Sequence, residues 1–416
     1  EDEKMVYEKR YPNGLRLVVK RMEGLLSVTM GILVGTGSSV ETDSEDGISH
    51  FIEHMQFKGT KKRTAFEISD AFDRIGAQVN AFTGKDVTCY YSKCTSDHPA
   101  EAFEILSDLF LDSTFPEEEM EKEKGVVCEE IAMTEDAPDE LCLDLLSSAY
   151  YGNDGYGRNI LGPASNVRGF TREDIFRYKA ERYCPENIVI SFAGGVDMQT
   201  AEALVETCFG KLEKGNFRPR DKQIRTCGLS LIKTKPIEQV HIAIGYPSLP
   251  REHELSDALQ TANSVLGGSM SSRLFQEVRE KMGLAYSVYS YLSAFQECGS
   301  LVIYAGVNPA NADKAYGAIG KVVADMKKEG IGRDEFLRGR EQMKSAMLFS
   351  QESTPSQMLL YGKHMLFNDA LFDFEGKLDA INSISEDMVR EAISLTFPEE
   401  GKAVAAVGNI DKPFAL

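Results

Sequence analysis

The sequence predicts an α+β protein made of two related domains, and three observations support this. The chain has 416 residues, more than one hydrophobic core usually organises, so two domains of about 200 residues each are expected. Strand patterns and helix patterns mix along the chain. Three segments of the first half also recur in the second half in the same order, which indicates an internal repeat.

The first predicted element is a β-hairpin over residues 7–20, because Asn13-Gly14 is a typical hairpin turn and alternating apolar residues follow it. The next patterns, in order, are a strand over 28–34, a helix over 65–75, a strand over 87–93 and a helix over 100–111. The last of these places Phe103, Leu106 and Phe110 on one face, which should be buried.

Each pair of matching segments is only weakly similar, and the evidence for an internal repeat is that the pairs occur in the same order in both halves. The matching segments are 27–32 with 239–244, 75–77 with 282–285, and the strand closing each half, 188–197 with 403–411. We therefore expect two similar domains; two unrelated α+β domains are the alternative.

A polar, charged stretch between the two halves predicts a linker. It covers residues 213–226 and contains Pro219. The expected division is an N-terminal domain over 1–212 and a C-terminal domain over 227–416. The second half has no histidine where the first has its metal motif, so only the first half is expected to bind metal.

Composition excludes two classes of partner and indicates a compartment. A net charge of -19 without a long basic cluster argues against nucleic-acid binding. We expect no membrane span, because no apolar stretch reaches about 20 residues, and residues 1–4 lack the plan of a signal peptide. The eight cysteines include no Cys-x-x-Cys pair, which predicts reduced thiols in a cytoplasm of bacterial type, with an organellar matrix as the alternative.

The strongest chemical signal is the motif His50-Phe51-Ile52-Glu53-His54. A helix places positions i and i+4 on one face, so both histidines can bind one cation, with Glu53 beside them. A catalytic zinc takes three protein ligands and keeps a position open for water, so the third ligand must come from elsewhere. The alternative is a helix whose two histidines are capped by a glutamate or exposed.

An acidic helix predicted to begin near Glu117 offers the third ligand. The candidates are Glu121, Glu123, Glu129 and Glu130. A buried stripe is expected along Val126, Val127 and Ile131. Glu123 and Glu130 lie two turns apart beside that stripe, so both can approach a buried ion.

The run from Gly47 to Thr60 resembles the core of the pitrilysin-type inverzincin peptidases, above all the β subunit of mitochondrial processing peptidase and its short bacterial homologues. The resemblance extends over nearly the whole chain. It implies that each domain is a mostly antiparallel sheet with helices packed on one face, together half of the family's clamshell. It also implies one Zn²⁺ per chain and a homodimer that completes the chamber around peptide substrates.

The resemblance assigns the chemistry to five glutamate and histidine positions already singled out. It makes His50, His54 and Glu130 the zinc ligands and gives Glu123 a supporting role beside a ligand histidine. Glu53 becomes the general base that takes a proton from the zinc-bound water and passes it to the leaving amine.

The resemblance also assigns residues to the substrate. Asn80 and Ala81 belong to an edge strand onto which an extended peptide pairs, with an ordinary strand as the alternative. Phe57, within the motif, is a further substrate-binding residue. In the second half, Arg279 and Tyr286 would donate hydrogen bonds to a substrate carbonyl or to its oxyanion. A surface arginine and a buried tyrosine are the alternative for this pair.

Glu140 and Asp144 lie one helical turn apart, and the resemblance makes them a pocket for an arginine near the cut. A solvated helix face is the alternative. The expected function is a zinc-dependent endopeptidase acting on unfolded peptides or presequence-like extensions. One rival is a non-catalytic partner subunit, which would be expected to have lost part of the metal set. A zinc hydrolase of other substrates is a second rival, with no use for the peptide-binding residues.

Overall fold

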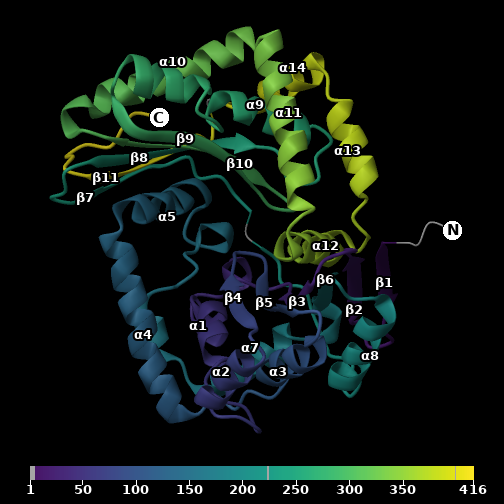
Figure 1. The fold of residues 1–416 in the computed structure, drawn as a ribbon. Helices are drawn as coiled ribbons and strands as arrows, with labels where there is room; N and C mark the ends of the chain where they lie inside the picture. The colour runs from purple at the N-terminus through teal and green to yellow at the C-terminus, as the bar shows by residue number, and fades with distance from the viewer. Residues whose placement is uncertain (1–4, 223, 399) are drawn as a thin grey trace. The chain divides into compact units, whose positions relative to one another are not determined.

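The computed structural model describes residues 5–222, 224–398 and 400–416 (Figure 1). Residues 1–4 and residue 223 of the predicted linker lie outside the described residues. The chain divides into two compact units, each built from three segments. Unit 1 contains residues 5–131, 159–222 and 349–373, and unit 2 contains 132–158, 224–348 and 374–416. Each unit therefore takes a segment from the other half of the sequence, whereas the sequence-based division has two continuous domains.

The sheet of unit 1 has six strands in the order β1-β2-β6-β3-β5-β4. Neighbouring strands are antiparallel except for the pair β2 and β6. The strands are β1 (Val6–Arg10), β2 (Arg16–Arg21), β3 (Ser27–Val34), β4 (Gln78–Thr83), β5 (Thr88–Thr95) and β6 (Ile188–Gly194). The predicted hairpin and the two predicted strands are confirmed, and β4 lies at the edge.

The sheet of unit 2 repeats this arrangement in the order β7-β11-β8-β10-β9, and its only parallel pair is β7 and β11. The strands are β7 (Ser230–Thr234), β8 (Val240–Ser248), β9 (Ala285–Ala294), β10 (Gly299–Val307) and β11 (Ala403–Gly408). In the matching order, β3 corresponds to β8, β4 to β9 and β6 to β11. These are the three pairs of segments in the predicted repeat, so the two related, mostly antiparallel domains are confirmed.

Helices cover one face of each sheet, as expected. Those of unit 1 are α1 (Ile48–Met55), α2 (Ala65–Arg74), α3 (Pro99–Leu111), α6 (Ala164–Gly169), α7 (Arg172–Arg182) and α8 (Met198–Phe209), and α4 (Glu117–Asp136) runs on into unit 2. Those of unit 2 are α9 (Ser256–Leu266), α10 (Ala312–Glu329), α11 (Arg333–Ser350), α13 (Phe374–Asn382) and α14 (Glu386–Leu395), with a π-helix over Phe275–Lys281. Phe103, Leu106 and Phe110 are all buried in the core of unit 1, as predicted.

The second face of each sheet is covered by a single helix from the other half of the sequence. In unit 1, α12 (Thr354–Asn368) lies against β2, β3 and β6 (Figure 1). Thr29 of β3 and Thr354 share a buried hydrogen bond of 2.8 Å between their hydroxyls. In unit 2, α5 (Pro138–Tyr151) lies against β8 and β11. Because both faces of the central strands are covered, almost every residue of β3 is buried.

Close packing of α12 makes Gly362 a test of this arrangement. A Cβ at Gly362 would lie 2.7 Å from Leu33 Cδ1 and 3.0 Å from Ser191 Cβ, whereas one at Gly317 of α10 would meet nothing within 4 Å. Gly362→Ala is therefore expected to destabilise the protein by about 1–3 kcal/mol through overpacking. The same change at Gly317 should stabilise by about 0.4–1 kcal/mol. Urea unfolding midpoints that shift in the same direction for both variants would contradict this packing.

One prediction for α4 is wrong. Val126 was expected in a buried stripe, but 46% of its surface is exposed. The buried side of α4 contains Met120, Glu123 and Val127, and Val126 is rotated from Val127 by about 100°. Glu121 and Glu135, on the other side of this helix, are exposed.

Three further features of the described chain concern its cysteines, its linker and the apolar length of its helices. The eight cysteines are all free thiols, four of them buried. The predicted linker contains no helix or strand among its described residues. No helix in the described part of the chain is both long and apolar enough to cross a bilayer.

Candidate active site

The site begins with helix α1, whose two sides have different partners. Phe51, Ile52 and Met55 are buried in the core of unit 1. This burial fixes the rotation of the helix and leaves His50, Glu53 and His54 on the opposite side. The i, i+4 spacing brings the two imidazole rings to 4.6 Å between centroids.

Glu130 of α4 meets both histidines. Its Oε2 atom lies 3.6 Å from Nε2 of His50 and 3.3 Å from Nε2 of His54. In the described ranges, this is the one group of three or more His, Cys, Asp or Glu that could hold a metal, with ligand atoms within 4.8 Å of one another.

These distances fit a zinc ion. Ligand atoms about 2.0–2.2 Å from one tetrahedral ion lie about 3.4 Å apart, close to the two separations at Glu130. Two imidazole nitrogens and one carboxylate oxygen are also a ligand set of catalytic zinc sites, which leave the fourth position open. The residues present therefore fit this metal.

Glu123 fixes the orientation of His54. Its Oε1 atom lies 2.8 Å from Nδ1 of His54, and its Oε2 atom forms an ion pair with Nζ of Lys58 at 2.8 Å. A carboxylate acceptor at Nδ1 places the ring proton there and leaves the lone pair of Nε2 facing Glu130. Burial opposes the ionisation of Glu123, but its bonds to His54 and Lys58 outweigh burial and lower its pKa.

The two histidines have opposite protonation tendencies. Burial, helped by the charge of His54, lowers the pKa of His50 to about 4, so its ring is neutral at physiological pH. Burial also disfavours the charged form of His54, but the hydrogen bond with Glu123 and the nearby carboxylates outweigh it and raise its pKa. Zinc needs neutral imidazole ligands, so metal binding would release a proton from His54 wherever it is protonated.

Glu53 lies on the same side of α1 and is held by one donor. The hydroxyl of Thr83, the last residue of β4, donates a short hydrogen bond to its carboxylate. Burial raises the pKa of Glu53, and the bond from Thr83 partly offsets this. A carboxylate with a raised pKa is better matched to accepting a proton near neutral pH.

The predicted substrate residues of unit 1 lie near α1, which packs against β4. Asn80 and Ala81 are in the edge strand, and Asn80 is exposed. Phe57 follows α1 and is partly buried against the core of unit 1. An edge strand next to the metal-binding helix is available for pairing with an extended peptide.

The remaining predicted residues belong to unit 2. The guanidinium of Arg279 lies 5.8 Å from the ring centroid of Tyr286 and 4.7 Å from that of Phe275. Tyr286 is 77% exposed, so the alternative of a buried tyrosine is wrong. On α5, Glu140 is exposed and Asp144 is partly buried. Of these four residues, Arg279 and Tyr286 lie side by side within unit 2.

Sequence reasoning missed two residues of the site, Lys58 and Thr83. Lys58 lies four residues after His54, and this spacing could have suggested a partner for an acidic residue near the metal. The sequence contains no signal for Thr83, because its contact with Glu53 depends on how β4 lies against α1.

Glu123→Gln is expected to weaken zinc binding about 10- to 100-fold, because the ligand His54 loses the carboxylate that orients it. Competition with a chelating dye measures the affinity. Glu129→Gln is the matched control, since Glu129 is exposed on the same helix. Equal affinities of Glu123→Gln and the control would show that Glu123 does not orient the ligand.

Comparison with known proteins gives consistent relatives over more than nine-tenths of the chain. Residues 16–164 match the family model described as "Insulinase (Peptidase family M16)", and residues 169–343 match "Peptidase M16 inactive domain". The chain is 42% identical over 399 residues to "Uncharacterized zinc protease YmxG" of Bacillus subtilis, covering 93% of this chain and 97% of that protein. It is 36% identical to "Uncharacterized zinc protease SCO5738" of Streptomyces coelicolor, covering 91% and 84%.

Two solved structures share the fold. A structure described as a peptidase M16 inactive domain from Pseudomonas fluorescens has a TM-score of 0.91 at 20% identity and covers 98% of both chains. A protease from Helicobacter pylori has a TM-score of 0.90 at 22% identity, covering 97% of this chain and 99% of the other. At these identities the likeness concerns the fold alone.

Proposed function

The chain belongs to the insulinase family, peptidase family M16, and from this premise we propose that it is a zinc-dependent endopeptidase acting on unfolded peptides or presequence-like extensions. One observation carries the proposal: the ligand atoms of His50, His54 and Glu130 converge, with Glu53 on the same side of α1. The "inactive domain" model begins at residue 169, after all four of these residues. That description therefore does not argue against an active first half.

In this proposal the two Nε2 atoms and the carboxylate of Glu130 hold the metal. Bound zinc would polarise the scissile carbonyl and acidify a water molecule. Glu53 accepts the proton of the attacking water and passes it to the leaving amine, while Thr83 holds its carboxylate in place. Glu123 keeps His54 in the tautomer that binds metal.

The resemblance implies substrate-binding residues in each half of the sequence. The edge strand β4 offers Asn80 and Ala81 for pairing with an extended substrate, and Phe57 would contact its side chains. Arg279 and Tyr286 would donate hydrogen bonds to a substrate carbonyl. The exposure of Tyr286 and its position beside the guanidinium of Arg279 support this role. The homodimer expected from the resemblance remains a prediction. Light scattering, which measures the molar mass of the protein in solution, tests it.

A preference for arginine near the cut is the finer part of the proposal. Glu140 and Asp144 both lie on α5, one turn apart, and can pair with a guanidinium. Exchanging them for Gln and Asn should selectively reduce cleavage next to arginine. An unchanged specificity profile would refute the pocket.

The test is mass-spectrometric mapping of cuts in a peptide library by the full chain, with and without a zinc chelator. We expect cleavage that the chelator abolishes and added zinc restores. Cleavage that persists without metal would overturn the zinc mechanism. A zinc-loaded chain that cuts no peptide would favour the rival of a non-catalytic partner subunit.

A further inference from the structure

The N-terminus of the metal-binding helix is capped from a distance. The residue before α1 is Gly47, in a left-handed conformation with φ of 95°, and it has no side chain to cap the helix. A Cβ at this position would lie 2.5 Å from the carbonyl oxygen of Leu161, so another residue type would clash with the backbone. A Ser, Thr, Asp or Asn residue, which usually caps a helix, therefore does not fit at this position.

Glu41 takes over the capping role. Its carboxylate is buried, and its two oxygens accept the backbone N–H groups of Gly47 at 2.9 Å and Ser49 at 2.8 Å. The first N–H groups of a helix have no partner within the helix, and a buried one without a partner is costly. Ser49 directly precedes His50, so this carboxylate holds the backbone next to a candidate ligand.

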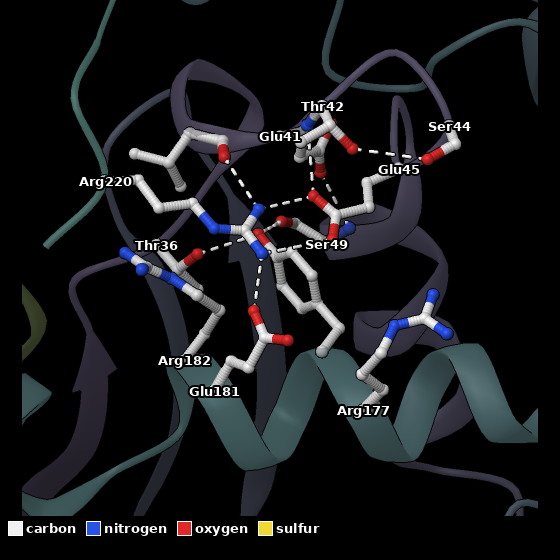
Figure 2. Close-up of polar contacts among 12 residues, drawn as sticks. Thr36, Glu41, Thr42, Ser44, Glu45, Ser49, Arg177, Glu181, Arg182 and Arg220 are labelled. Carbon is white, nitrogen blue, oxygen red and sulfur yellow. Dashed lines mark hydrogen bonds and ion pairs between the residues drawn. The ribbon is translucent and has the colours of Figure 1, made fainter. Parts of the chain in front are cut away.

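Residues 41–47, which we call the capping loop, are held in turn by Arg220 of the predicted linker (Figure 2). One guanidinium nitrogen donates to Glu45 at 2.5 Å and to the carbonyl of Val40 at 3.2 Å. The other donates to Glu45 at 3.2 Å and to Glu181 of α7 at 2.6 Å. Arg220 thus joins the residue before the capping loop, the middle of the loop and helix α7.

A third connection reaches the same turn of α1. The buried hydroxyl of Tyr178 lies 2.9 Å from the hydroxyl of Ser49 and 2.8 Å from that of Thr36. This bond, the carboxylate of Glu41 and the loop held by Arg220 converge on the first turn of α1. Within the described part of the chain, the hydrogen bonds of Glu41 and Arg220 go to Gly47, Ser49, Val40, Glu45 and Glu181, and not to a candidate ligand, to Glu53 or to Thr83.

We propose that Glu41 and Arg220 are positioning residues of the metal site, an inference that rests on the proposed zinc function. Helix α1 has only eight residues, so its first turn carries His50 and its second carries His54. A small shift of the first turn changes the distance from His50 to Glu130, and metal sites tolerate deviations of only about 0.2 Å from ideal ligand distances. The linker between the two halves of the sequence thereby becomes part of the scaffold of the metal site.

The experiment measures the zinc dissociation constant of the full chain by competition with a chelating dye. Glu41→Gln loses one of two acceptors and should weaken binding about tenfold. Arg220→Gln loses the ion pairs that hold the capping loop and should weaken binding about threefold. Hydrogen exchange of the Gly47 and Ser49 amides should be faster in both variants. A general loss of stability would instead speed exchange throughout the chain, not only in this turn.

Two matched controls carry the same substitutions elsewhere. Glu67→Gln removes a carboxylate that accepts a backbone N–H at the start of α2. Arg273→Gln removes an arginine that bonds both oxygens of Glu335 and a backbone carbonyl in unit 2. Both controls should bind zinc as wild type does.

The outcomes separate this inference from the proposed function. Folded Glu41→Gln and Arg220→Gln variants with wild-type zinc affinity, or controls that lose as much, would overturn the positioning role alone. If Glu41→Gln fails to fold, Arg220→Gln decides. A wild-type chain that binds zinc no more tightly than Glu130→Gln would instead overturn the zinc function itself.

Discussion

Glu53→Gln is expected to keep zinc bound and to lower kcat by about three orders of magnitude. The substitution preserves size but removes the group that accepts a proton from the attacking water, and general acid–base catalysis typically contributes about 10²–10⁴-fold. Glu53 is not one of the three converging ligand residues, so zinc content should not change. Cleavage of a fluorogenic peptide and zinc content, measured on the same preparation, provide the two readouts.

The partner of Glu53 provides a graded comparison. Thr83→Val removes the hydroxyl that holds the carboxylate but leaves the base itself, so its effect on kcat should be much smaller than that of Glu53→Gln. Wild-type turnover in Glu53→Gln would exclude Glu53 as the base. Loss of zinc in this variant would show that the residue acts as a ligand instead.

Much of the site could be predicted because its geometry is local. The sequence spacing of His50 and His54 specifies one face of α1, and the sequence spacing of Glu123 and Glu130 specifies one face of α4. Among the four candidate glutamates, helical spacing favoured Glu123 and Glu130 over Glu121 and Glu129, and the family resemblance then selected Glu130 as the ligand. The structure places Glu130 at both histidines and leaves the other two exposed.

The exchange of helices between the units could not be predicted from the sequence. An amphipathic pattern shows that α5 and α12 each have a buried side, but not which sheet buries it. The repeat pointed to each half folding on its own strands, whereas α5 packs against β8 and β11 and α12 packs against β2, β3 and β6. What decides is tertiary packing, such as the fit of Gly362 against Leu33 and Ser191.

The scaffold around α1 was missed for a similar reason. Glu41 and Arg220 carry no motif, and their partners lie far along the chain, in the case of Arg220 at Glu45 and Glu181. A linker composition predicts an irregular segment, which the structure has, but gives no signal that one of its arginines is anchored.

Glu130→Gln should remove the metal and the activity together. A neutral amide is a much weaker zinc ligand than a carboxylate, and the two remaining imidazoles do not complete a catalytic ligand set. The loss in zinc affinity should exceed the roughly 100-fold upper end seen when a supporting residue is removed. It should therefore be larger than the loss in Glu123→Gln, and dye competition on both variants measures the ranking.

Glu129→Gln makes this a test of ligand identity as well as of metal binding. The two glutamates are neighbours on α4, but on a helix they point about 100° apart, and only Glu130 faces the histidines. We expect Glu129→Gln to bind zinc and cut peptides as wild type does. The reverse result, with zinc retained in Glu130→Gln and lost in Glu129→Gln, would mean that α4 is rotated in the metal-bound protein and that the third ligand is Glu129.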